Sequence, residues 1–276
     1  MAETSVEDTI ARPERFTVPS FRQRKAEGRK IVMVTAYDFP SARIAERAGV
    51  DVVLVGDTVM LMLGYENTVP VTLDEMIHHT RAVRKGVKRA LLVGDMPFGS
   101  YQTGPEEAIR SATRFLKEGG AQAVKLEGGA PVTETVRRMV EVGIPVVGHV
   151  GLTPQSVNAF GGHRAQGRDP DAARRMLADA KALEAAGACA IVLETIPATL
   201  AAEITASVSI PTIGIGAGPD CDGQVQVWYD ILGISTGRVY RHVKRYAELG
   251  QVMEDAVRQY AEEVRERRFP TSEHSI

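Results

Sequence analysis

The sequence is short of cysteine and of long apolar runs, and each shortage excludes a class of protein. The only two cysteines, Cys189 and Cys221, lie in neither a CxxC spacing nor a histidine cluster, which argues against a disulfide scaffold or a zinc site. No apolar run approaches the roughly 18 residues of a membrane span. Residues 1–16 form a polar N-terminal lead without the apolar centre of a signal peptide. We therefore expect a cytoplasmic protein in a reducing compartment, with no membrane partner.

An excess of charge of one sign is also missing. The chain carries 33 Lys and Arg against 35 Asp and Glu, and its basic residues form no cluster, so nothing favours nucleic acid as a partner. A small-molecule partner is expected instead. With 276 residues, of which 44% are hydrophobic, the chain can bury a full core and fits one α/β barrel better than two independent domains.

Four short apolar runs each lead directly to a carboxylate. The run at residues 51–56 precedes Asp57, and similar runs end in Asp95, Glu127 and Glu194. Continuous Val, Leu and Ile runs of this length are typical of parallel strands that are buried on both faces. Ligands bind at the carboxyl ends of such strands. We therefore predict that these four acids form the functional site.

The order of the elements predicts a (β/α)₈ barrel of the α/β class with right-handed crossovers, because eight strands alternate with helices. Helix-closing pairs such as Ala48-Gly49 and Ala186-Gly187 recur just before strands, as in a repeated unit. A capping box at residues 72–75 predicts a helix to about residue 85. We expect one barrel domain over residues 17–267, with an N-terminal helical extension at 17–28 that could close the barrel bottom, C-terminal helices at 241–267 and a tail at 268–276. The predicted strands are 31–35, 51–56, 90–94, 123–126, 144–148, 189–193, 212–215 and 231–235.

Lys125 and Glu127 are two apart on one predicted strand, so both side chains should face the barrel interior. Buried charges need a partner, which is each other, a metal or a ligand, and a purely structural ion pair is the alternative. Asp57 and Asp95, at neighbouring strand ends, would repel each other. A divalent cation removes that repulsion, and oxygen ligands without nearby His or Cys favour Mg²⁺. The alternative is that each aspartate caps the helix after it.

Three further features each leave two interpretations open. Glu194 has apolar neighbours, which suits a general base, although a strand-end acid paired with an arginine has the same sequence pattern. His149 either hydrogen-bonds a substrate or caps its loop, and the sequence favours neither. The glycine-rich residues 214–218 could cradle a phosphate or only allow close backbone packing.

Ten motifs occur in the order found in the ketopantoate hydroxymethyltransferase family, and the chain resembles that family over residues 34–247. The resemblance implies a barrel that uses Mg²⁺ and 5,10-methylenetetrahydrofolate, as co-substrate, to hydroxymethylate 3-methyl-2-oxobutanoate to ketopantoate in pantothenate and coenzyme A biosynthesis. It also implies a homo-oligomer, usually a decamer. The motifs are TAYD, VGD, GYENTVPVTLDEM, GDMPFGSY, VKLEGG, GHVGLTPQ, GGHRAQG, VLETIP, IGIGAGPDCDGQV and RHVKRYA.

Carried over by position, the resemblance assigns a role to each candidate residue. The metal ligands are Asp57, Asp95 and, directly or through water, Glu127. Lys125 and the Thr58 hydroxyl bind the keto acid, and Glu194 is the catalytic base. We also expect Asp57, Asp95 and His149 among the substrate-binding residues.

The sequence departs from the family pattern in three places. The loop after Asp57 reads GDTVM where the family usually has GDSLGM, so Thr58 replaces a serine and the loop is one residue shorter. Tyr229 stands where histidine is common, and His163-Arg164 where an aromatic residue and lysine are common. Two other functions are compatible with the pattern: a Mg²⁺-dependent lyase or mutase of the phosphoenolpyruvate/pyruvate barrels, and a non-catalytic keto-acid-binding barrel.

Overall fold

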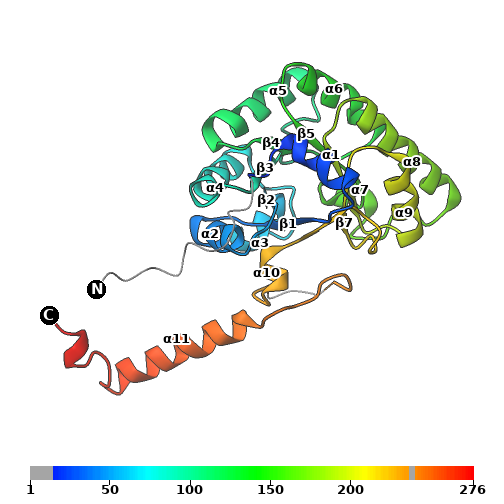
Figure 1. Ribbon diagram of the computed structural model, residues 1–276. Coiled ribbons are helices and arrows are strands. Elements are labelled where there is room, and N and C mark those ends of the chain that lie inside the picture. Colours follow the sequence, from blue (N-terminus) through cyan, green and yellow to red (C-terminus); the bar gives the residue numbers. More distant parts are fainter. Residues whose placement is uncertain (1–14, 236–239) are drawn as a thin grey trace, which may run out of the picture. The chain divides into compact units, whose positions relative to one another are not determined.

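Eight parallel strands close into a barrel in the computed structural model, which describes residues 15–235 and 240–276 (Figure 1). Each strand pairs with the next one along the chain. The predicted fold class is therefore confirmed, and seven of the predicted strands coincide with observed ones. The strands are β1 Ile31–Thr35, β2 Val52–Val55, β3 Leu91–Asp95, β4 Ala123–Lys125, β5 Val146–Gly151, β6 Ala190–Glu194, β7 Thr212–Ile215 and β8 Gly223–Gln226.

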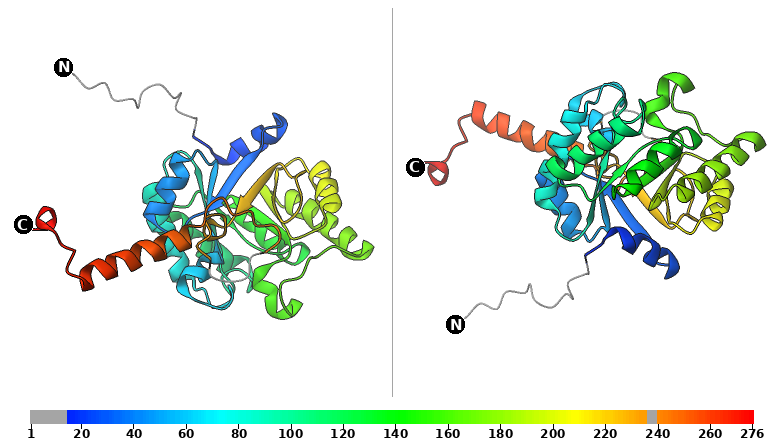
Figure 2. Two further views of the ribbon diagram at one scale, coloured as in Figure 1. Left: turned by 90° about the horizontal axis from the view of Figure 1, so that it is seen from below. Right: turned by 90° about the horizontal axis from the view of Figure 1, so that it is seen from above.

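Helices alternate with the strands and surround them, as Figures 1 and 2 show. The predicted capping box is present, because Thr72 accepts from the Glu75 backbone N–H and the Glu75 carboxylate accepts from the Thr72 N–H. The helices of the first compact unit, which ends at Val225, are α1 Val18–Ala26, α2 Phe39–Arg47, α3 Met60–Leu63, α4 Leu73–Gly86, α5 Pro105–Arg114, α6 Thr133–Glu141, α7 Val157–Phe160, α8 Pro170–Ala185 and α9 Ala198–Ser207.

The N-terminal helix α1 closes the amino end of the barrel, as predicted. Phe16, just before this helix, and Phe21 on it are buried in one cluster with the inward residues of the strands. Several of those partners, such as Ile31 and Leu91, are the first residues of their strands. The two aromatic rings meet edge to face, with centroids 5.3 Å apart. The amino-terminal end of the barrel is thus filled by apolar side chains, and charged side chains lie at the carboxyl ends of the strands.

The predicted eighth strand, 231–235, was wrong. The strand that completes the barrel is β8, which lies earlier in the chain, whereas Trp228–Ile231 forms the short helix α10. The sequence of β8, GQVQ, has one apolar residue, so it lacked the apolar run that marked the other strands. Its pairing is set instead by tertiary contacts, including the hydrogen bond from the Ile31 N–H to the Asp222 carbonyl at 3.0 Å.

The second compact unit, residues 226–276, contains α10, the helix α11 (Leu249–Arg265) and a 3₁₀ turn at Ser272–His274. The predicted helix at 241–267 therefore begins eight residues late. Before α11 begins, the backbone bonds to the α10 segment instead of forming a helix, as in the hydrogen bond from the Tyr246 N–H to the Ile231 carbonyl at 2.8 Å. No helix in the described part of the chain is long and apolar enough to cross a membrane. The predicted domain limits, 17–267 and 268–276, stay predictions.

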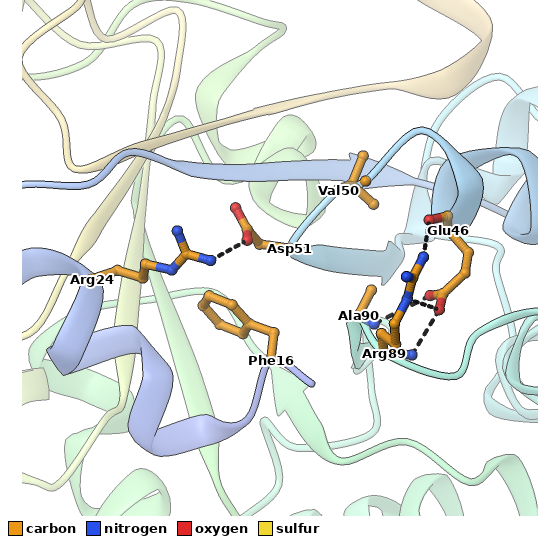
Figure 3. A pocket seen from close by; sticks show the side chains of 8 residues that line it. Phe16, Arg24, Glu46, Val50, Asp51, Arg89 and Ala90 are labelled. Atoms are coloured by element: carbon orange, nitrogen blue, oxygen red, sulfur yellow. Dashed lines mark hydrogen bonds and ion pairs between the residues drawn. The ribbon is translucent and has the colours of Figure 1, made fainter. Parts of the chain in front are cut away.

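A small pocket near the starts of β2 and β3 is lined by paired charges (Figure 3). Arg24 pairs with Asp51 at 3.1 Å, and Arg89 pairs with Glu46 at 3.3 Å. The Glu46 carboxylate also accepts the backbone N–H of Arg89 at 2.8 Å and of Ala90 at 3.2 Å. These bonds join α2 to the chain that enters β3, so the pocket belongs to the barrel's structural framework.

Glu46→Gln should lower the free energy of unfolding at pH 7 by about 1.5–3 kcal/mol, the range for hydrogen bonds to a charged group. Burial alone would raise the pKa of Glu46, but the N–H groups of Ala90 and Arg89 hold that pKa below its usual value. The Glu46 carboxylate therefore stabilises the folded chain fully at pH values above its unfolded-state pKa. This stabilisation is lost as the pH falls through the lower folded-state pKa. Urea titrations at several pH values, with the exposed Glu203→Gln as control, should show the deficit shrinking below about pH 4. A deficit independent of pH would contradict this account.

Candidate active site

The two predicted metal-binding aspartates lie next to each other at the carboxyl ends of β2 and β3. Asp57 begins a 3₁₀ turn, Asp57–Val59, and Asp95 is the last residue of its strand. Both side chains are buried. The Asp57 backbone N–H donates to Asp95 Oδ2 at 3.1 Å, so Asp95 is held against the neighbouring strand end rather than capping a helix.

Lys125 lies at the end of β4, where the strand register places it beside Asp95. Its Nζ is 2.8 Å from Asp95 Oδ1 and 3.9 Å from Glu127 Oε1, so the shared orientation predicted for Lys125 and Glu127 is confirmed. Burial alone would lower the pKa of Lys125. The charges of Asp95, Glu127 and Asp57 have the larger effect and raise the pKa above its usual value, so the ammonium stays charged. The lysine therefore bridges two acids rather than pairing with Glu127 alone.

His149, in β5, connects this group to Glu194 at the end of β6. Its Nδ1 is 3.5 Å from Glu127 Oε1, and its Nε2 is 3.3 Å from Glu194 Oε2. Burial and the Lys125 charge oppose protonation, but the carboxylates of Glu127 and Glu194 outweigh them and raise the pKa of His149 to about 9. The raised pKa favours the protonated ring, although Lys125 Nζ lies 3.3 Å from the same Nδ1. Its side chain faces two acids instead of capping a loop, and Glu194 is paired with this histidine rather than with an arginine.

The group carries an excess of negative charge. Four carboxylates, when all are ionised, meet two cations, Lys125 and His149. Burial, with the charges of Asp95 and Glu127, raises the pKa of Asp57 well above its usual value. This is the electrostatic setting in which a divalent cation is stabilised.

Thr58 keeps the hydroxyl that the family has at this position. Its Oγ1 lies 2.7 Å from the Tyr37 hydroxyl. The shorter loop after Asp57 folds into the 3₁₀ turn and α3, which ends at Gly64 with a φ of 72°. The change from serine therefore leaves a hydrogen-bonded hydroxyl next to Asp57.

Two residues of the site were missed in the sequence. Gln155 donates from Nε2 to Asp57 Oδ2 at 3.0 Å, and the Tyr101 hydroxyl accepts the Glu127 N–H at 3.2 Å. Both are buried. The motif GHVGLTPQ contained the only available signal for Gln155, a polar residue soon after a predicted strand. For the glycine-rich segment 214–218, close packing is what the structure shows, since a Cβ at Gly218 would lie 2.5 Å from that of Ala198.

The fold and the site define an α/β-barrel enzyme with buried charges at the carboxyl ends of its strands. Solved structures with this fold include 2,3-dimethylmalate lyase, a PEP mutase/isocitrate lyase superfamily member, with a TM-score of 0.59 and 18% identity over 94% of this chain and 90% of that one. Phosphonopyruvate hydrolase in complex with oxalate and Mg²⁺ has a TM-score of 0.59 and 15% identity, covering 93% of this chain and 92% of that one. At such identities the likeness establishes the fold alone.

The family model for ketopantoate hydroxymethyltransferase matches residues 15–272. The 3-methyl-2-oxobutanoate hydroxymethyltransferase of Carboxydothermus hydrogenoformans is 57% identical over 95% of this chain and 96% of its own length. The enzyme of the same name from Pelobacter propionicus is 55% identical over 95% of this chain and 98% of its own length. The chain belongs to the ketopantoate hydroxymethyltransferase family, which confirms the resemblance.

Proposed function

We propose that this chain transfers a hydroxymethyl group to 3-methyl-2-oxobutanoate and forms ketopantoate for pantothenate biosynthesis. A hydroxymethyltransferase of this family implies 5,10-methylenetetrahydrofolate as co-substrate. The observation that carries the proposal is the continuous chain of contacts from Asp95 through Lys125, Glu127 and His149 to Glu194, at the end of the barrel where ligands bind. These contacts support Glu194 as the base, next to buried charged groups that would bind an α-keto acid.

The acids also fit Mg²⁺. Within residues 15–235 and 240–276, no three His, Cys, Asp or Glu side chains form a ready-made metal site. Mg²⁺ does not need one, because it retains several waters and is held by one or two carboxylates together with its substrate. Asp57 and Asp95 would hold the ion, and Glu127, one oxygen of which accepts the Gln155 N–H at 3.0 Å, would approach it directly or through water. When bound, Mg²⁺ would polarise the keto acid's carbonyl as a Lewis acid.

The chain's own residues would carry the proton and the charge. Glu194 would take the proton from the carbon beside the ketone, and the His149 imidazolium, 3.3 Å away, orients that carboxylate. Lys125 and His149 are fixed cations near the place where negative charge develops on the enolate oxygen. The Thr58 hydroxyl, next to Asp57, would hydrogen-bond the keto acid. The carbon made nucleophilic in this way would form a bond to the one-carbon unit of the folate, the bond from that unit to the folate nitrogen would break to release tetrahydrofolate, and water would supply the hydroxyl oxygen of ketopantoate.

Keto-acid consumption with and without methylenetetrahydrofolate tests this function. A hydroxymethyltransferase should consume 3-methyl-2-oxobutanoate only when the folate is present, and ketopantoate should accumulate in equal amount. Consumption without the folate would indicate a lyase or mutase. Binding without consumption would indicate a non-catalytic barrel.

We also propose that the protein is a cytoplasmic homo-oligomer, with the family's decamer as the expected form. Helix α11 supports assembly, because none of its 17 residues is buried. Met253, Val257, Tyr260 and Val264 follow each other at helical spacing and are all exposed, forming one apolar stripe. A stripe of this kind is typical of a surface that another copy covers.

Val257→Glu should therefore yield a smaller assembly than the wild type, because it places a charge in the middle of this stripe. Gln251→Glu, on the opposite side of α11, is the matched control and should leave the assembly unchanged. Size-exclusion chromatography with light scattering measures both. An unchanged mass for Val257→Glu would show that the stripe takes no part in assembly.

A further inference from the structure

Gln155 is a buried amide that contacts three strand ends of the site. It lies on the 3₁₀ turn Pro154–Ser156 after β5 and is 4% exposed. Its Nε2 donates to Asp57 Oδ2 at 3.0 Å and to the Met96 carbonyl at 2.9 Å. Its backbone N–H donates to Glu127 Oε2 at 3.0 Å. One residue thus holds two of the three carboxylates assigned to the cation.

The neighbours of Gln155 determine which way its amide faces. The Met96 carbonyl can only accept, so the nitrogen end must point toward it and toward Asp57. The oxygen end accepts from the Tyr101 hydroxyl at 2.7 Å and from Gln102 Nε2 at 3.2 Å. Both amide hydrogens and the amide oxygen are therefore satisfied in this one orientation.

The contact with Asp57 leaves the other carboxylate oxygen for a ligand. Among the described residues, Oδ2 of Asp57 takes the Gln155 bond, and no hydrogen bond reaches Oδ1. Glu127 is fixed as well, because its Oε2 accepts the Gln155 N–H while its Oε1 faces Lys125 and His149. A carboxylate with one oxygen already bound has fewer orientations to lose when a cation arrives.

We propose that Gln155 is a positioning residue for the cation site: its side chain orients Asp57, and its backbone orients Glu127, so that the acids are set before the ion binds. The inference rests on the proposed function, because it requires the cation site on Asp57 and Asp95. Gln155 itself is not a ligand of the ion, since its amide oxygen, the atom that could coordinate a cation, accepts from the Tyr101 hydroxyl and from Gln102 Nε2.

Mn²⁺ titration followed by electron paramagnetic resonance of the free ion tests this role, with Mg²⁺ as competitor. Gln155→Met keeps the volume but cannot donate to Asp57, and it should bind Mn²⁺ about 10- to 100-fold more weakly, as is typical when a partner that orients a metal ligand is lost. Gln155→Asn is a second, milder variant that keeps the amide but withdraws it from Asp57. It should also bind more weakly.

Thr80→Val is the matched control, because it keeps the volume and removes a buried hydrogen bond, from Thr80 Oγ1 to the Met76 carbonyl at 2.7 Å, that lies on helix α4 and has no contact with the Gln155 network. Its Mn²⁺ affinity should stay within about threefold of the wild type, even where urea unfolding shows an equal loss of stability. Equal weakening in Thr80→Val and Gln155→Met, or wild-type affinity in both Gln155 variants, would overturn the role of Gln155 and leave the cation site standing. Failure of the wild type to bind Mn²⁺ at all would overturn the cation site and this role together.

Discussion

Lys125→Met should abolish turnover and, without metal, lower the free energy of unfolding by about 3–5 kcal/mol, the cost of breaking a buried ion pair from one side. The Lys125 ammonium lies 2.8 Å from Asp95 and 3.9 Å from Glu127, and it is the cation closest to Asp95 in the described contacts. Its removal leaves buried carboxylates facing one another. Turnover should fall because the same ammonium would bind the keto acid.

Urea unfolding in EDTA and in excess Mg²⁺ measures the stability, and calorimetric titration with 3-methyl-2-oxobutanoate measures the affinity. Mg²⁺ should restore part of the lost stability, since a divalent ion bound at Asp57 and Asp95 replaces the missing positive charge. The exposed Lys117→Met is the control and should change neither quantity. A large loss of stability with normal keto-acid affinity would show that Lys125 is only a structural partner of the acids.

Most of the barrel could be predicted because its strands are buried on both faces. The runs of β2 and, up to Glu194, of β6 are continuously apolar, as is typical of a parallel sheet covered by helices. The eighth strand could not be predicted in this way, since Val225 is its only apolar residue. The run at 231–235 is apolar but belongs to a different unit, so local composition pointed to the wrong segment.

The acids could be predicted from residue type and position, but their partners could not. A carboxylate at a strand end is visible in the sequence, and the barrel then brings neighbouring strand ends together. The contact of Lys125 with Asp95 depends on the register between β3 and β4, which the sequence does not display. Gln155 was missed because its bonds reach Asp57 and Met96, far away in the chain, through a turn whose shape depends on the surrounding loops.

Glu194→Gln should slow formation of the enolate by roughly 10²-fold to 10⁴-fold, the contribution typical of a positioned general base. The amide keeps the shape of the side chain but cannot accept the substrate proton. Binding of Mg²⁺ and of 3-methyl-2-oxobutanoate should remain, because the proposed metal ligands Asp57 and Asp95 lie on other strands. Calorimetric titration with each ligand checks that the pocket is intact.

Exchange of the single proton on the carbon beside the ketone into deuterated water, followed by NMR, tests the assignment of Glu194 most directly. The measurement needs no transfer to folate, and it should be repeated with tetrahydrofolate, which carries no one-carbon unit, in case the folate must close the site. Glu203→Gln, an exposed carboxylate on the helix after β6, serves as the control and should exchange as the wild type does. We expect the wild type to catalyse the exchange in the presence of Mg²⁺ and Glu194→Gln to lose it by at least about 10²-fold. Exchange by Glu194→Gln at nearly the wild-type rate would contradict the account and direct attention to His149.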